Sequence, residues 1–233
     1  MEYCSSFHPK GRQELKHAIT ICDYQIIRNK LRHFMRLDQN AGSEGRYLIR
    51  SAYFDNFENK VLTEKKEGYI SRDKYRVRIY GKSEDIINLE RKSKRNNLTF
   101  KSKCEITRKE FEKMRVTEIE WMKNDPRSLI RDLYVEMFYH QIRPVTVVDY
   151  IREPYVYPYG NVRVTFDLKI QTSIRNTNMF DKNLPMVDVL EDNIVILEVK
   201  YDEYLPEVIK RLLQLADTRQ EAYSKYQLSR MYI

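Results

Sequence analysis

Apolar and polar residues alternate along several stretches of the chain, a pattern typical of β-strands with one apolar and one polar face. Eight such stretches are predicted as strands, over residues 12–18, 46–54, 72–80, 86–94, 98–107, 145–152, 162–170 and 194–201. Apolar residues at helical spacing predict helices over residues 23–37, 109–122, 126–140 and 208–215. Residues 171–192 have no clear period and are expected to form a long loop, with a short helix over 184–190. These elements predict an α+β fold.

Local signals indicate where some of these elements begin and turn. Asp23 is expected to cap the first helix, and Pro126 suits the first turn of the third helix. The segment Tyr80-Gly81-Lys82-Ser83 predicts a hairpin between the third and fourth strands. We find no internal repeat and no low-complexity linker, so residues 1–233 are expected to form a single domain.

Charged residues gather on one face of most predicted strands. Between residues 74 and 80, the two faces carry Lys74, Arg76, Arg78 and Tyr80 against Tyr75, Val77 and Ile79. Between residues 162 and 170, they carry Arg163, Thr165, Asp167 and Lys169 against Val162, Val164, Phe166, Leu168 and Ile170. A single strand of this kind is common in a sheet that has one wet face. The repetition favours an eight-stranded antiparallel β-barrel with helices packed on its outside, because its charged faces then line a polar channel.

The charge of the chain indicates an anionic partner. Lys and Arg number 42 and Asp and Glu 34, which gives a net charge of +8. The excess is compatible with nucleic acid, an acidic membrane surface or a phosphorylated small molecule. No glycine-rich phosphate loop is present, since Gly42 and Gly45 are the only close pair and no Walker lysine follows them. Phosphate would therefore be held by side chains, for which arginine is especially suited.

Several classes of protein are excluded by what the sequence lacks. Cys4, Cys22 and Cys104 are scattered, so they indicate neither a zinc site nor a disulfide framework. The first residues have no apolar core of a signal peptide, and no stretch approaches eighteen consecutive apolar residues. We expect a cytoplasmic protein without a transmembrane segment.

A series of short motifs gives the chain a resemblance to a known family. In chain order the motifs are Glu14-Leu15-Lys16, Arg50-Ser51-Ala52-Tyr53-Phe54-Asp55, Arg76-Val77-Arg78-Ile79-Tyr80, Glu90-Arg91-Lys92, Tyr150-Ile151-Arg152, Arg163-Val164-Thr165-Phe166-Asp167, Leu197-Glu198-Val199-Lys200 and Ser224-Lys225-Tyr226. Each motif is weak alone, but together and in order they are specific. The chain resembles the VTC domain family, within the triphosphate tunnel metalloenzymes of the CYTH-like superfamily.

The resemblance implies an eight-stranded antiparallel tunnel that binds triphosphate or polyphosphate. In the catalytic branch of the family, the tunnel polymerises the terminal phosphate of ATP into inorganic polyphosphate with Mn²⁺ or Mg²⁺. Carried over by motif, the phosphate-binding residues are Lys16, Arg50, Arg76, Arg78, Lys92, Lys101, Lys103, Tyr150, Arg152, Arg163, Lys200, Ser224 and Lys225. Lys103 is favoured over Lys101. Glu198 is expected to bind the metal, and Glu14 is the second candidate metal ligand, although each could instead pair with a neighbouring lysine.

One departure from the family pattern bears on the reaction. Arg12 stands where related triphosphatases and cyclases have a second acid, which favours a polyphosphate polymerase-like phosphotransferase. A metal-dependent triphosphatase, polyphosphatase or NTPase is the alternative from the same site. A non-catalytic polyanion-binding module also stays open, since the 18 tyrosines could stack on single-stranded nucleic acid. Nucleic acid is disfavoured because the cations cluster with acids on strand faces. The expected partners are ATP and inorganic polyphosphate or triphosphate, and the sequence leaves protein partners open.

Overall fold

Ten strands form one antiparallel sheet in the computed structural model, which describes residues 12–81, 83–96, 98–213 and 224–230. The strands are β1 (Gln13–Thr20), β2 (Arg36–Leu37), β3 (Tyr47–Asp55), β4 (Ser71–Tyr80), β5 (Asn88–Arg95), β6 (Leu98–Glu105), β7 (Arg143–Tyr157), β8 (Val162–Ser173), β9 (Met186–Asp188) and β10 (Ile194–Tyr201). The helices are α1 (Ile21–Leu31), α2 (Lys60–Lys66), α3 (Arg108–Arg115), α4 (Ser128–Tyr139), α5 (Glu207–Leu212) and α6 (Lys225–Ser229). Three 3-10 turns complete the described part: η1 (Gln39–Ala41), η2 (Glu120–Met122) and η3 (Tyr159–Asn161). The predicted α+β class is confirmed.

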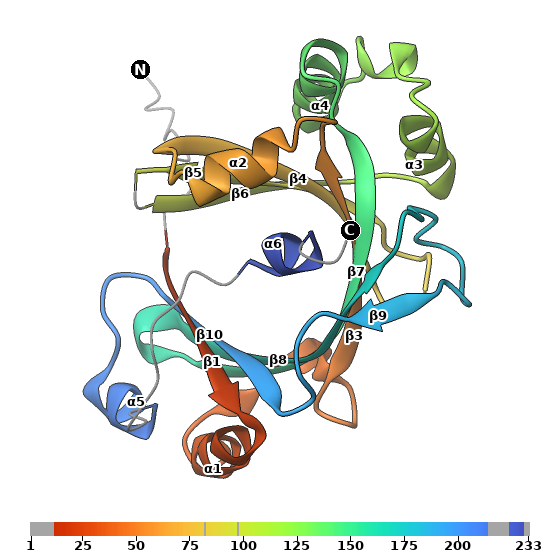
Figure 1. Ribbon diagram of the computed structural model, residues 1–233. Coiled ribbons are helices and arrows are strands. Elements are labelled where there is room, and N and C mark those ends of the chain that lie inside the picture. Colours follow the sequence, from red (N-terminus) through yellow and green to blue (C-terminus); the bar gives the residue numbers. More distant parts are fainter. Residues whose placement is uncertain (1–11, 82, 97, 214–223, 231–233) are drawn as a thin grey trace, which may run out of the picture.

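The sheet curls around a central space. Its hydrogen-bonded order is β1-β10-β8-β7-β3-β4-β5-β6, with β2 added to β7 and β9 added to β8. Figure 1 shows this path bending around α6, so that β4, β5 and β6 face β1, β8 and β10. Between the two edge strands, the described residues make one isolated bridge, Arg12 to Thr99, and no ladder. The prediction of eight strands is thus extended by β2 and β9, and closure of the sheet by hydrogen bonds is not found.

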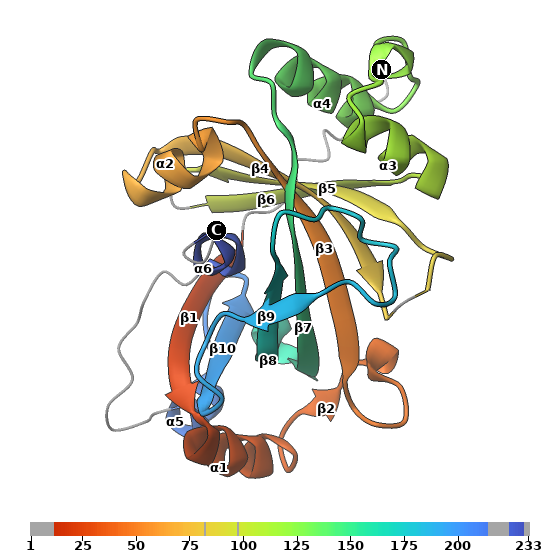
Figure 2. The ribbon, with the colours of Figure 1, turned by 45° about the vertical axis from the view of Figure 1, so that its right-hand side comes forward.

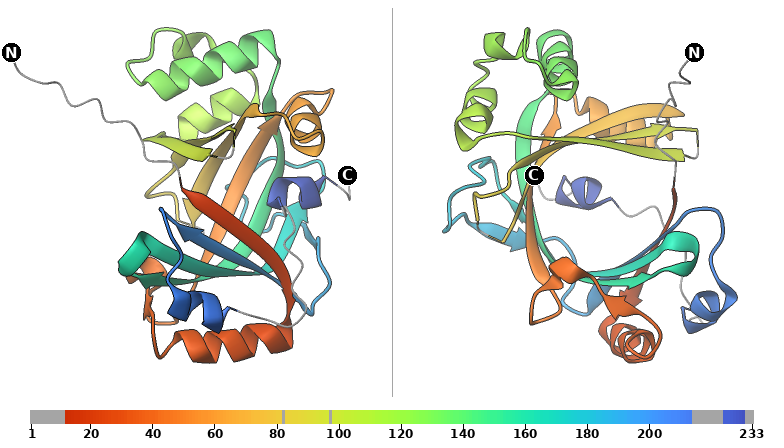
Figure 3. Two further views of the ribbon diagram at one scale, coloured as in Figure 1. Left: turned by 90° about the vertical axis from the view of Figure 1, so that its left-hand side faces the viewer. Right: turned by 180° about the vertical axis from the view of Figure 1, so that it is seen from behind.

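Helices cover the apolar outer face of the sheet on two sides, as Figures 1 and 3 show. On one side, α3 and α4 pack Phe111 and Leu133 against Val77 and Leu89 of β4 and β5. On the other side, α1 and α5 form a second cluster around β8 and β10. Its buried members include Ile27, Leu31, Val164, Phe166, Val199 and Ile209. The alternation predicted for β4 is confirmed, because the residues between its cations point into this outer core.

A third apolar cluster lies on the inner side of the curved sheet. Tyr226 of α6 packs there with Ile49 and Tyr53 of β3 and with Tyr150 of β7. Figure 2 shows α6 between the two walls of the sheet, beside the end of β10. The inner face therefore carries apolar side chains along β3, from Ile49 to Tyr53, as well as charged ones. None of the helices in the described ranges has the length and apolar character needed to cross a membrane.

The ends of the helices differ from those predicted. Thr20, not Asp23, is the N-cap of α1; Asp23 is the third helical residue and returns the hydrogen bond in a capping box. The helix predicted to Leu37 ends at Leu31, and the residues after it turn to form β2. Pro126 precedes the N-cap Arg127 and lies outside α4. A local signal thus identified each helix but shifted its start by two residues.

Three further segments depart from the sequence-based assignment. The helix predicted over 109–122 ends at Arg115, because Thr117 adopts a left-handed φ of 62°. Residues 184–190 contain strand β9 instead of a helix, since Gln171 of β8 pairs with Asp188. In β8, Lys169 also has a positive φ, 47°, and the residue after it, Ile170, joins the inner cluster. Lys169 itself is exposed and does not share the inner face with Arg163. Helix α2 was not predicted.

Candidate functional site

A cavity of about 420 Å³ lies between the walls of the curved sheet. Twelve lysines and arginines and three glutamates are among the residues that line it. The predicted site residues in this lining are Glu14, Lys16, Arg76, Arg78, Lys92, Lys101, Tyr150, Arg152, Arg163, Glu198, Lys200, Ser224 and Lys225. Seven strands and helix α6 contribute them, so the topology brings together residues that are more than 200 positions apart in the chain.

Two predicted phosphate-binding residues do not line the cavity. Arg50 lies on the other face of β3, where Nε and Nη2 donate to Asp149 at 2.8–3.1 Å and Nη1 donates to the carbonyls of Met179 and Asp181. Arg50 is 3% exposed and acts as a clamp on the loop after β8. Lys103 is exposed on edge strand β6, outside the lining, whereas Lys101 lies within it. Of these two lysines, Lys101 is therefore the one placed to meet a ligand in the cavity.

The β4–β6 wall holds its cations around one buried carboxylate. Glu90 is 2% exposed, and its Oε2 accepts from Arg76 Nε at 2.8 Å, with Nη2 at 2.7 Å. Lys101 Nζ lies 2.5 Å from its Oε1. Arg78 donates to Ser51 and to the Tyr150 hydroxyl, and its Nη1 is 3.8 Å from Glu90. Arg78 is therefore held in place while one terminal nitrogen lacks a close partner among these groups.

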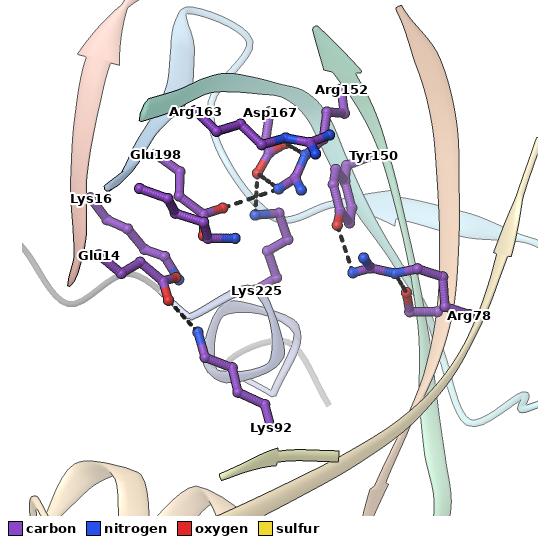
Figure 4. A network of polar contacts seen from close by, with 12 residues as sticks. Glu14, Lys16, Arg78, Lys92, Tyr150, Arg152, Arg163, Asp167, Glu198 and Lys225 are labelled. Carbon is purple, nitrogen blue, oxygen red and sulfur yellow. Dashed lines mark hydrogen bonds and ion pairs between the residues drawn. The ribbon is translucent and has the colours of Figure 1, made fainter. Parts of the chain in front are cut away.

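The opposite wall carries two glutamates with lysines between them. Glu14 Oε1 is 2.9 Å from Lys16 Nζ, and Glu14 Oε2 is 2.5 Å from Lys92 Nζ of β5. Glu198 Oε1 is 2.9 Å from Lys200 Nζ. Register explains the arrangement, since Glu14 pairs with Lys200 and Lys16 with Glu198 across β1 and β10. Figure 4 shows Lys92 reaching Glu14 from the facing wall.

A buried network extends this wall into β7 and β8. Arg152 donates to both oxygens of Asp167, at 2.7 and 2.8 Å, and to Glu198 Oε2 at 3.0 Å. Lys225 of α6 forms an ion pair with Asp167, and its Nζ lies 4.6 Å from the centre of the Tyr150 ring. Figure 4 shows these side chains close together, with Asp167 between Arg152 and Lys225. Each carboxylate is shared by at least two cations, so the cations face the cavity with only partial charge compensation.

Helix α6 is fixed at one end of the cavity by contacts from three strands. The Tyr226 hydroxyl donates to Asp55, a fully buried carboxylate at the end of β3 that also accepts from the backbone of Val61 at 2.8 Å. Ser224 caps the helix and accepts from Lys74 Nζ at 3.0 Å. These bonds hold Ser224 and Lys225 in the cavity wall.

The comparison with protein families decides the membership of the chain. A family model described as the VTC domain matches residues 11–232. The chain belongs to the VTC domain family. The match spans nearly the whole sequence, so it includes the curved sheet, the cavity lining and α6.

Other comparisons of this VTC domain gave weaker likenesses. It is similar to the PH1819 protein from Pyrococcus horikoshii OT3, at 15% identity and a TM-score of 0.48, over 95% of this chain and 99% of that one. It is also similar to a "putative adenylate cyclase" from Bacillus halodurans, at 13% identity and a TM-score of 0.47, over 82% and 81% of the two chains. At these values the likenesses carry no argument. Comparison with curated proteins gave no significant match.

The structure adds residues to the site of the VTC domain that sequence reasoning did not include. Lys74 lines the cavity, and its Nζ lies 4.9 Å from the centre of the Tyr226 ring. Glu90 and Asp167 are the carboxylates that hold the arginines, and Tyr53 accepts from Arg76. Strand alternation places Lys74 on the same face as Arg76, but none of the family motifs includes it. Nothing in the sequence signals the pairing of Asp167 with Lys225.

Burial and crowding change the acidity of the cavity lysines. Burial lowers the pKa of Lys74 well below its ordinary value, and neighbouring Lys92 and Lys16 lower it further. Burial and Lys16 bring the pKa of Lys92 to about 8 although Glu14 opposes them. Burial lowers the pKa of Lys16 too, but Glu14 and Glu198 outweigh it, and the result is a raised pKa. An anion placed among Lys74 and Lys92 would favour their protonated forms.

Two carboxylates of the VTC domain suit a divalent metal. Glu14 on β1 and Glu198 on β10 both line the cavity from adjacent strands, two register positions apart. Within the described ranges no three His, Cys, Asp or Glu side chains gather as a metal site. Mg²⁺ is commonly held by one or two carboxylates together with substrate phosphates and waters. The two glutamates therefore fit a metal that binds jointly with a phosphate ligand, and not one held in a complete protein cage.

Proposed function

We propose that this VTC domain is a polyphosphate polymerase-like phosphotransferase that transfers the terminal phosphate of ATP to an inorganic polyphosphate chain, with Mn²⁺ or Mg²⁺ as cofactor. One observation carries the proposal: a single cavity lined by twelve lysines and arginines against three glutamates. Arg91 pairs with Asp132 of α4, but the other cations still outnumber the glutamates, and two of them, Arg78 and Arg152, are buried. Such a surplus of cations is unfavourable in an empty site and is relieved by a polyanion. A phosphate chain supplies several charges in a narrow volume, and its oxygens accept charge-assisted hydrogen bonds.

The positions of the cations support a linear ligand. Lys74, Arg76 and Arg78 follow one another on the inner face of β4, roughly 7 Å apart along the strand. Lys16, Lys200 and Arg152 face them from the other wall. A chain of phosphates between the walls would meet cations from both sides at successive positions.

The proposed reaction needs positioning and charge neutralisation more than covalent chemistry. A terminal oxygen of the bound chain forms a bond to the γ-phosphorus of ATP, the bond from that phosphorus to the β–γ bridging oxygen breaks, and ADP leaves. The planar guanidinium groups of Arg76, Arg78 and Arg152 would bind the phosphoryl oxygens in fixed orientations. Glu14 and Glu198 would hold the metal, which supplies neutralisation of phosphate charge when bound.

Hydrolysis is the second candidate reaction, since water could replace the chain as acceptor. Arg12 favours transfer over hydrolysis: at the position of the second acid of related triphosphatases, its guanidinium Nε lies 2.9 Å from Asp202. Without this second acid, Glu14 and Glu198 are the two carboxylates of β1 and β10 that could bind a metal in the cavity. Binding without catalysis is the third candidate and is separated by the same experiment.

The test is incubation of the purified protein with ATP and Mn²⁺ or Mg²⁺, followed by separation of ADP, phosphate and polyphosphate. We expect ADP and polyphosphate to accumulate together, and Arg78→Ala to lose this activity at least 100-fold because a buried, preoriented charge is removed. Arg108→Ala is the control, since Arg108 pairs with Glu84 on the surface. Release of free phosphate would favour hydrolysis, and the absence of both products would refute catalysis. Full activity of Arg78→Ala would refute the site.

A further inference from the structure

The two ends of the cavity differ in chemistry. At one end, Tyr47 opens β3 and Tyr80 closes β4, and their rings meet edge to face with centroids 5.8 Å apart. Both tyrosines line the cavity, yet Tyr80 is 40% exposed. The Tyr47 hydroxyl accepts from Arg163 Nη2 at 3.2 Å, which fixes its ring. This end is an aromatic rim with a cation beside it.

The other end is cationic and partly filled by helix α6. Ser224 and Lys225 enter the wall there, next to Lys74 and Tyr53. Tyr53 lies six residues after Tyr47 on β3, roughly 20 Å along the strand. A ligand that has one anionic part and one aromatic part would therefore bind in one orientation, with its anionic part toward α6.

We infer that the rim formed by Tyr47 and Tyr80 binds the base of a nucleoside triphosphate whose phosphates point into the cavity. The inference rests on the proposed function and adds where the base lies, in which direction the nucleotide binds, and that other bases are accepted. Tyr80 shares its face of β4 with Arg78 and Arg76, which follow at roughly 7 and 13 Å along the strand. A base stacked on Tyr80 thus leaves the ribose at the mouth and puts the phosphates beside the two arginines.

The rim has an aromatic surface but few groups that could read the edge of a base. Arg163 beside the rim is paired with Asp38 and donates to the Tyr47 hydroxyl. The neighbouring lining residue on β3, Ile49, is apolar. Stacking on an aromatic ring is tolerant of base identity because every base has a π face. The rim therefore binds nucleoside triphosphates as a class, and we expect ATP and GTP to bind with affinities within about threefold of each other.

The experiment compares Tyr80→Ala with the wild-type protein in calorimetric binding of ATP and of inorganic tripolyphosphate, each with Mg²⁺. The loss of stacking should weaken ATP binding on the order of tenfold and leave tripolyphosphate binding unchanged. Tyr80→Phe keeps the ring and should retain the wild-type affinity for ATP. Tyr139→Ala is the matched control, since Tyr139 is 72% exposed on α4, outside the cavity.

Each outcome bears on the rim separately from the cavity. An unchanged affinity of Tyr80→Ala for ATP would overturn the inference, as would an equal loss for ATP and tripolyphosphate. Tyr80→Leu repeats the comparison with a side chain that fills similar space without a π face, and it must also lose ATP selectively. Failure of the wild-type protein to bind tripolyphosphate would instead refute the proposed function.

Discussion

Replacing Glu90 with glutamine separates the stability of the empty cavity from its affinity for anions. Glu90 is buried and takes hydrogen bonds from Arg76, while Lys101 pairs with its other oxygen. Removing one partner of a buried ion pair costs about 3–5 kcal/mol. Lys101 has a 47% exposed side chain and adds little to this. For a chain of this size, each kcal/mol corresponds to about 2–4 °C, so Glu90→Gln should lower Tm by roughly 6–20 °C.

The same change should not weaken the binding of phosphate. Glu90 competes with a ligand for Arg76 and Arg78, and the glutamine no longer carries a negative charge toward it. We therefore expect tripolyphosphate to bind at least as tightly as to the wild-type protein. At 100 times its Kd, the ligand should return about 2.7 kcal/mol of stability.

Thermal unfolding followed by fluorescence, with and without tripolyphosphate, measures both effects. Glu84→Gln is the control, because Glu84 forms an exposed pair with Arg108 that contributes under about 1 kcal/mol. If Glu90→Gln unfolds at the wild-type temperature, Glu90 does not stabilise the folded protein by offsetting the repulsion between Arg76, Arg78 and Lys101. A variant that loses both stability and tripolyphosphate affinity would show that Glu90 orients the arginines instead of competing for them.

Three further predictions concern the pH dependence of binding and stability, the buried ion pair of Arg50, and metal binding. Tripolyphosphate affinity should fall as the pH rises through 8, because burial and neighbouring cations bring the pKa of both Lys92 and Lys101 to about 8. The free energy of unfolding of the empty protein should rise between pH 8 and 10.5, because in this range the two lysines are protonated in the unfolded chain but not in the folded protein. Titration calorimetry measures the fall in affinity, and thermal unfolding measures the rise in stability. Arg50→Ala should lower Tm by at least 6 °C yet leave the Kd of tripolyphosphate within about twofold, as binding to the folded protein will report. Glu198→Gln should weaken Mn²⁺ binding in the presence of tripolyphosphate at least tenfold, measured by paramagnetic relaxation of water protons.

The strands with alternating apolar and charged residues were the part of the fold and of the site that could be predicted from the sequence. In β4 the sequence places Arg76 and Arg78 on the inner face because every second residue is apolar, and the structure has them there. In β3 the same reasoning was ambiguous, since Arg50 and Tyr53 fall on opposite faces and a motif alone assigned the arginine. The deciding contact is the register that sets Arg50 opposite Asp149, which depends on how β3 meets β7.

Contacts between distant segments could not be predicted from the sequence. Asp167 and Lys225 are 58 positions apart and meet only because α6 returns to the inner side of the sheet. The N-cap residue of helix α2 makes no capping side-chain bond, and the amides of Val61 and Leu62 donate instead to Asp55 at the end of β3. Such elements depend on tertiary partners and leave a weak local signal.

The position of α6 has a consequence for synthesis on the ribosome. Of the described elements, α6 is made last, yet it supplies Ser224 and Lys225 to the cavity and the phenol that Asp55 accepts from. Domains can begin to fold from their N-terminal side as the chain emerges. A nascent chain with all ten strands already outside the ribosome would therefore still lack the last wall of its cavity, and it acquires the complete set of cations only when residues 224–230 have emerged.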